Sequence, residues 1–222
     1  MYVPAHFEET RIDELHRIIG QYPLGALVIN GPNGLDANHV PFELDATSAE
    51  RGVLRAHVAR ANPVWTEVRE GDHVLVVFRA ADAYISPNWY PSKHEFHKDV
   101  PTWNYQVVNV HGRISIRDDE KYVRGVLARL TRIHEGRTDA RKAWRMGDAP
   151  REHIDGLLKA IVGIEIEITK MVGKSKIGQN REERDRAGAA NELGKRGHQA
   201  ISSAMLNLRE TSTCEHRHGP PV

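Results

Sequence analysis

The strongest constraint on the fold of this chain is an alternation of apolar and polar residues in segment 163–173, which is strict over 164–169. From position 164 to position 168 every second side chain is isoleucine, and glutamates stand between them. A period of two places alternate side chains on opposite faces of a β-strand, so the segment predicts a strand with one buried face. The rest of the chain has to supply a sheet and a core that cover this face.

Other short apolar runs predict at least five further strands. They lie at 26–29, 40–44, 52–58, 73–79 and 106–116. A Gly-Pro-Asn-Gly cluster separates the first two runs, which is typical of a β-hairpin. The sequence therefore predicts a sheet with hairpin connections.

Helical spacing predicts a smaller number of helices between and after these strands. The first begins at Thr10, which forms a capping box with Asp13. Three more are expected over 119–134, over 151–161 and in the stretch that runs to about 208. Because strands and helices do not alternate regularly, we expect a mainly β fold with flanking helices, an α+β barrel rather than a doubly wound sheet.

Composition excludes several classes of protein. The 222 residues carry 31 basic and 30 acidic side chains, which argues against non-specific binding to nucleic acid. The single cysteine, Cys214, cannot form an intrachain disulfide, and no apolar run is long enough to span a membrane. We expect a cytoplasmic protein without membrane contact, with one domain over 1–208 and a disordered tail over 209–222.

The segment 84–105 is unusually rich in aromatic residues. It holds six of the fourteen aromatics, three prolines that fix its corners, and the cations Lys93 and Lys98. Rigid rings beside cations suit a planar anionic ligand. The alternative is a loop whose rings form a satellite core or a dimer contact.

Polar residues gather where three of the predicted strands begin or end. Basic side chains there can bind phosphate, and amide side chains can pair with the edge of a heterocycle. The basic residues are Arg60, Lys174, Lys176 and Arg181, and the amides are Asn38, Asn62, Gln179 and Asn180. Turn and capping chemistry is the alternative role for such residues.

Several longer motifs resemble those of the PaiB family of FMN-binding negative transcriptional regulators. The resemblance extends from Met1 to Arg186 and rests on MYVPAHF, ANHVPFEL, HVARANPVW, DAYISPNWYPSK, VPTWNY and GKSKIGQNR. The family is similar to the pyridoxamine-phosphate-oxidase-like flavoproteins. The resemblance therefore implies a split β-barrel homodimer with FMN between the subunits.

The resemblance also implies a set of cofactor-binding residues. From the ends of the second and third strands these are Asn38, His39, Val40, His57, Arg60 and Asn62. Arg60 is expected to pair with the phosphate, and groups around His39 and His57 are expected to meet the ring edge. Lys174, Gln179, Asn180 and Arg181 complete the site, with Trp103 and Tyr105 from the other subunit.

Two functions follow from the resemblance, and the sequence leaves both open. One is a flavin-dependent sensor or negative regulator that acts with DNA or a regulatory protein as partner. The other is a small-molecule redox enzyme that uses FMN, or haem b as in piperazate synthases, with unknown catalytic residues. His57 is the candidate axial ligand if the cofactor is haem, and no other metal site is predicted.

Overall fold

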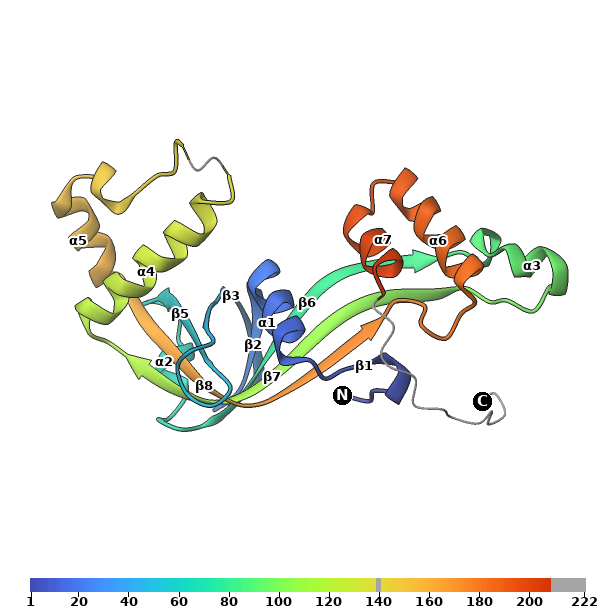
Figure 1. The fold of residues 1–222 in the computed structure, drawn as a ribbon. Coiled ribbons are helices and arrows are strands. Elements are labelled where there is room, and N and C mark those ends of the chain that lie inside the picture. Colours follow the sequence, from blue (N-terminus) through green and yellow to red (C-terminus); the bar gives the residue numbers. More distant parts are fainter. Residues whose placement is uncertain (139–140, 209–222) are drawn as a thin grey trace. The chain divides into compact units, whose positions relative to one another are not determined.

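The computed structural model describes residues 1–138 and 141–208, and the chain divides into two compact units (Figure 1). Unit 1 comprises residues 1–80 and 106–175, and unit 2 comprises residues 81–105 and the chain from 176 onward. The single domain expected over 1–208 stays a prediction. The tail expected at 209–222 lies outside the described residues.

The strands form one sheet in the order β3-β2-β6-β7-β8-β5-β4, and β1 pairs with β8. Their bounds are β1 Glu8–Glu9, β2 Leu24–Gly31, β3 Gly34–Pro41, β4 Glu43–Asp45, β5 Val53–Ala59, β6 His73–Ile85, β7 Thr102–Arg117 and β8 Ile161–Lys176. The pairings of β1 with β8, β2 with β3 and β6, and β5 with β4 and β8 are antiparallel. The predicted class, mainly β with flanking helices, is confirmed.

The alternating segment forms the middle of β8, as its period predicts. Ile164 and Ile166 are fully buried and Ile168 is 4% exposed, whereas Glu167 faces solvent. These isoleucines belong to the main core of unit 1, together with residues of β2, β5, β6 and β7. Burial of the apolar face of β8 therefore anchors the sheet.

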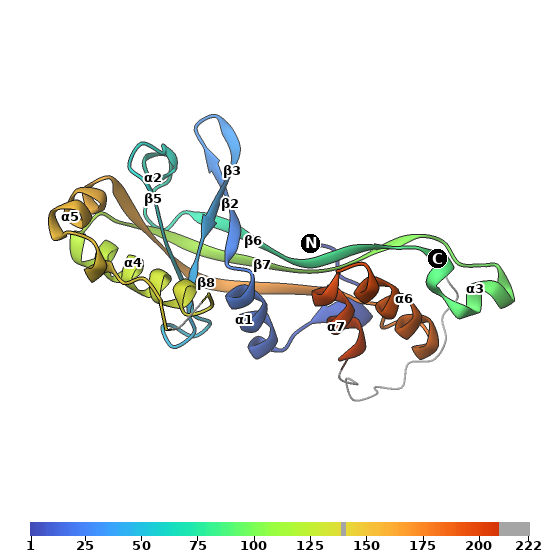
Figure 2. The same cartoon turned by 90° about the horizontal axis from the view of Figure 1, so that it is seen from above.

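The predicted hairpin is formed by β2 and β3, which Figure 2 shows as a pair of adjacent strands. Their register pairs Ala26 with His39 and Gly31 with Gly34. Gly34 has φ of +101°, a conformation that a residue with a side chain rarely adopts. The turn sequence thereby sets the register that places Asn38 and His39 on β3.

Four helices flank the sheet of unit 1, besides two short 3-10 turns at Ala5–Phe7 and Met146–Asp148. They are α1 Ile12–Gln21, α2 Val64–Glu67, α4 Glu120–Glu135 and α5 Arg151–Lys159, with α4 beside β4 and β5. The predicted capping box at Thr10 is wrong. Arg11 is the N-cap of α1, and no side chain caps the helix. The Glu9 carboxylate accepts from the backbone N–H of Arg11 at 3.0 Å, just before the first turn.

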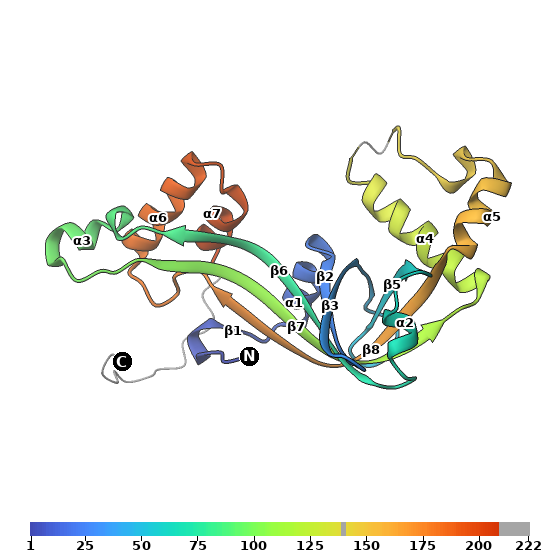
Figure 3. The same ribbon diagram turned by 180° about the vertical axis from the view of Figure 1, so that it is seen from behind.

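Unit 2 contains the proline-cornered segment and the C-terminal helices, which Figure 3 shows beside the ends of β6 and β7. The segment forms a 3-10 turn, Pro87–Trp89, and α3, Pro91–Phe96, each beginning at a proline. The other helices are α6 Glu183–Lys195 and α7 Gln199–Leu206. Tyr90 and residues of α6 and α7 form a separate core, so part of the aromatic segment is structural.

Within the described ranges, no helix combines the length and the apolar character that crossing a membrane requires.

Candidate functional site

Two of the predicted site segments meet in unit 1, at the ends of β3 and β5. Asn62 Nδ2 donates to Asn38 Oδ1 at 2.7 Å, and Asn38 Nδ2 donates to Asp36 at 2.8 Å. Asn62 Oδ1 in turn accepts from the backbone N–H of Val64 at 3.0 Å, in the first turn of α2. The two amides therefore hold each other in fixed orientations.

His39 and Val40 contribute to this site in different ways. Val40 is 5% exposed and packs in the main core, so only its main chain can meet a ligand. His39 is exposed. Among the described strands β3 stands at one end of the sheet order and pairs with β2 only. An edge strand presents main-chain donors and acceptors that a bound heterocycle can use.

Arg60 lies just beyond β5 and forms a bidentate ion pair with Asp118. Its Nη1 and Nη2 donate to the carboxylate at 2.9 and 2.5 Å, and its Nε donates to the Lys159 carbonyl at 2.9 Å. Hydrogen bonds from Arg60 lower the pKa of Asp118 below its ordinary value. The guanidinium also lies 5.7 Å from the ring centroid of Trp65. A cation is thus held in position close to Asn62.

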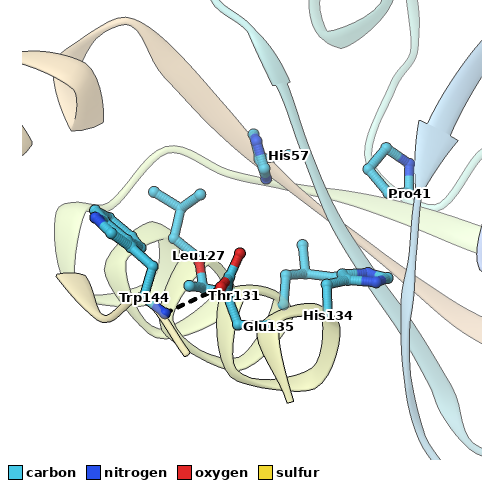
Figure 4. Close-up of a pocket in the computed structure, with 8 residues that line it drawn as sticks. Pro41, His57, Leu127, Thr131, His134, Glu135 and Trp144 are labelled. Atoms are coloured by element: carbon cyan, nitrogen blue, oxygen red, sulfur yellow. Dashed lines mark hydrogen bonds between the residues drawn. The ribbon is translucent and has the colours of Figure 1, made fainter. Parts of the chain in front are cut away.

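His57 lines a cavity of about 270 Å³ in unit 1, which Figure 4 shows above α4. The other lining residues are Pro41, Leu127, Leu130, Thr131, His134, Glu135 and Trp144. The imidazole is half-buried, and its Nδ1 is buried without a hydrogen-bond partner among the described residues. Burial lowers the pKa of His57 below its ordinary value. The His57 ring therefore lines the cavity, whereas its unpartnered Nδ1 is itself buried.

Lys174, the remaining predicted residue of unit 1, lies away from these contacts on β8. Its Nζ donates to the carbonyl of Tyr2 at 3.3 Å and lies 6.0 Å from the Tyr2 ring centroid. Its backbone pairs with Glu8 of β1. Among the described residues, Lys174 therefore contacts the N-terminal segment at Tyr2.

The other predicted residues belong to unit 2. Trp103 is 53% exposed and packs edge-to-face against Tyr84, with ring centroids 6.1 Å apart. Gln179 accepts from the backbone N–H of Ile177 at 2.9 Å. Arg181 pairs with Asp99 and its Cζ lies 4.8 Å from the ring centroid of Tyr90. Tyr105 is partly buried, and Asn180 is exposed.

Sequence reasoning missed Asp118, Trp65 and the whole lining of the cavity outside β3 and β5. Asp118 is separated from Arg60 by 58 positions, and the α4 residues show only the ordinary helical period. No local signal could have indicated these contacts. Among the described residues, no group of three or more His, Cys, Asp or Glu side chains could hold a metal ion.

A family model and two relatives match most of this chain. The family model described as "Putative FMN-binding domain" matches residues 1–170. An uncharacterized protein of Aspergillus fumigatus is 31% identical, with 95% of this chain and 97% of the relative covered. Protease synthase and sporulation protein PAI 2 of Bacillus subtilis is 28% identical, with 83% and 85% covered.

Two solved structures share the fold at low sequence identity. The FAD and heme binding protein from Mycobacterium smegmatis has a TM-score of 0.57 and 16% identity, with 77% of this chain and 74% of that chain covered. The flavocytochrome Anf3 from Azotobacter vinelandii has a TM-score of 0.56 and 12% identity, with 80% and 73% covered. The similarity confirms the predicted fold class.

Proposed function

Because this chain belongs to the FMN-binding family that includes PaiB-like proteins, and FMN is its cofactor, we propose that it is a homodimeric flavin-dependent sensor and negative regulator of transcription. In this proposal FMN binds at the ends of β3 and β5, and a second copy completes the site. The observation that carries the proposal is the hydrogen bond between Asn38 and Asn62, which joins the two predicted segments.

The groups at this strand end fit the edge of an isoalloxazine ring. The pyrimidine part of the ring alternates hydrogen-bond acceptors with a donor, and it needs both kinds of partner on the protein. The main chain of β3 near His39 offers both, and the fixed amides of Asn38 and Asn62 add further polar atoms. FMN bound there supplies electron or hydride transfer.

Arg60 fits the phosphate of FMN as a cation held in a fixed orientation. Three of its contacts, with Asp118, Lys159 and Trp65, orient the guanidinium at the end of β5. A bidentate guanidinium suits a phosphate as well as it suits a carboxylate, so phosphate competes with Asp118 for the same donors.

Substitution of Arg60 tests this assignment. Arg60→Ala is expected to weaken FMN binding about tenfold or more, because a charge-assisted contact with the phosphate is lost. Fluorescence titration with FMN measures the change. Asp118→Asn is the matched control, since it removes the ion pair and keeps the guanidinium. If Asp118→Asn weakens binding as much as Arg60→Ala does, Arg60 acts only through its ion pair and not on the phosphate.

The second copy is proposed because unit 2 carries exposed groups suited to a flavin. The edge-to-face pair of Trp103 and Tyr84 offers aromatic surface, and Gln179, Asn180 and Arg181 are polar. In the proposed dimer, Trp103 and Tyr105 of the second copy cover the isoalloxazine ring. Lys174, Gln179, Asn180 and Arg181 complete the site. Light scattering measures the oligomeric state, and an FMN titration of the same sample measures whether the dimer binds the cofactor. A monomer that binds FMN tightly would contradict the shared site.

Regulation through a partner protein is favoured over direct reading of DNA. Residues 196–198 join α6 to α7, and Gly197 in this turn has φ of +84°, so the pair has the general form of a helix-turn-helix. The second helix should read bases, yet α7 contains no Lys or Arg. We expect no shift of duplex DNA in an electrophoretic mobility assay. A shift that weakens steeply with salt would contradict indirect action.

A redox enzyme is the second candidate, and the unpartnered Nδ1 of His57 favours it. A neutral imidazole beside a cavity is also the side chain that haem iron would use. The absorption spectrum of the purified protein separates these possibilities, because flavin bands support FMN and a Soret band supports haem. Reduction of the bound flavin by a nicotinamide donor would favour the enzyme over the sensor.

A further inference from the structure

The cavity beside His57 has walls of two different kinds. Pro41, Leu127 and Leu130 make one part of the lining apolar, and Glu135 and Trp144 place a carboxylate and an indole in the same lining (Figure 4). No Lys or Arg is among the eight lining residues. At about 270 Å³ the cavity is just below the range for the sites of drug-sized ligands, which begins at about 300 Å³. It suits a small molecule that is partly hydrocarbon.

Glu135 occupies a position where a negative charge is unfavourable by itself. It is the last residue of α4, and the carbonyl groups at a helix C-terminus carry partial negative charge. The backbone N–H of Trp144 donates to Glu135 Oε2 at 3.0 Å, which fixes the carboxylate at the cavity. A cation bound in the cavity would interact favourably with both the carboxylate and the helix end.

Two further groups suit the same cation. The indole of Trp144 can attract a cation through the face of its ring. The imidazole of His57 lines the same cavity. Its Nδ1 is buried, so only the rest of the ring can meet a ligand there. The three side chains, His57 on β5, Glu135 on α4 and Trp144, come from different parts of the chain and line one cavity.

We propose that this cavity binds a small organic ammonium ion, whose charged group meets Glu135 and His57 and whose hydrocarbon part contacts Leu127, Leu130 and Pro41. The inference rests on the proposed function and deepens it by naming the class of molecule that the flavin protein senses. Its ligand is recognised by charge and by apolar volume.

Calorimetric titration with three probes of similar size tests the proposal. The probes are phenethylamine, the neutral 2-phenylethanol and the anionic 3-phenylpropionate. Phenethylamine is expected to bind at least tenfold more tightly than the other two, because only the ammonium forms a charge-assisted hydrogen bond with Glu135. Equal binding of the alcohol, stronger binding of the carboxylate, or no binding of the amine would overturn the proposal.

Variants separate the cavity from non-specific effects. Glu135→Gln should weaken phenethylamine binding about tenfold or more, whereas Glu152→Gln removes the same charge from an exposed site on α5 and should leave binding unchanged. Leu127→Trp keeps the carboxylate and fills the cavity, so it should also abolish binding. Unchanged affinity in both Glu135→Gln and Leu127→Trp would place the amine elsewhere and overturn the proposal.

An FMN titration on the same samples distinguishes the two proposals. Amine binding that depends on Glu135 in a protein that does not bind FMN at Arg60 would support the cavity and contradict the proposed flavin site. FMN binding that depends on Arg60, in a protein that does not bind the amine, would support the flavin site and contradict the cavity proposal.

Discussion

Arg129→Met is expected to lower the free energy of unfolding by about 3 kcal/mol. Arg129 on α4 donates from Nε to both oxygens of the Glu43 carboxylate, at 2.6 and 2.8 Å. Glu43 on β4 is only 7% exposed. The methionine would leave this carboxylate buried without its cation, and removal of one partner of a buried pair is strongly destabilising. Urea denaturation followed by circular dichroism measures the change.

The double variant Glu43→Leu/Arg129→Met is the control for this prediction. It removes both charges, so its free energy of unfolding should return most of the way to that of the parent protein. A loss of less than about 1 kcal/mol in Arg129→Met alone would show that the pair is weak, as pairs in solvent are.

The second large effect is expected from Gly112→Ala in β7, with a loss of about 2–3 kcal/mol in the free energy of unfolding. A Cβ atom at this position would lie 2.4 Å from Ile166 Cγ2 and 2.6 Å from the Glu167 carbonyl oxygen. The second contact is with backbone, so rotation of a side chain cannot relieve it. The sheet would have to open between β7 and β8.

Gly156→Ala provides the matched control for Gly112→Ala. Gly156 lies in α5, and nothing is within 4 Å of the Cβ that alanine would add. Alanine should stabilise this helix by about 0.5–1 kcal/mol, because glycine loses more backbone freedom on folding. Thermal unfolding of both variants gives the comparison. If Gly112→Ala unfolds at the temperature of the parent protein, the close approach of β7 and β8 is not required for stability.

The sequence predicted the elements whose signals are local. The period of β8, the glycine in the β2–β3 turn and the helical spacing of α4 and α5 all act within a few residues, and the structure contains each of these elements. The start of α1 was predicted one residue too early. Glu9 pairs with Gly173 of β8 and accepts from the backbone N–H of Arg11, so the helix begins after Arg11 and without a side-chain cap.

The contacts within the candidate site join residues that lie far apart in the sequence, so local signals could not predict them. The motifs around Asn38 and Asn62 marked the right segments, but their direct hydrogen bond follows from the packing of the β3 and β5 strands. The same motifs pointed to Arg60 without its partner Asp118, since the two lie 58 positions apart. Which of the predicted residues touch FMN stays a prediction.

The sequence by itself determined most of the strands, the presence of the hairpin and the family, because periodicity, turn residues and motifs are properties of short segments. The run expected as one strand at 40–44 is divided in the structure between β3 and β4. Only the tertiary structure decided that Glu135 and Trp144 meet His57 at a cavity. A helix-terminal glutamate and a lone tryptophan are ordinary in sequence. Their joint chemistry appears only when tertiary packing places a carboxylate, an indole and an imidazole around the same small space.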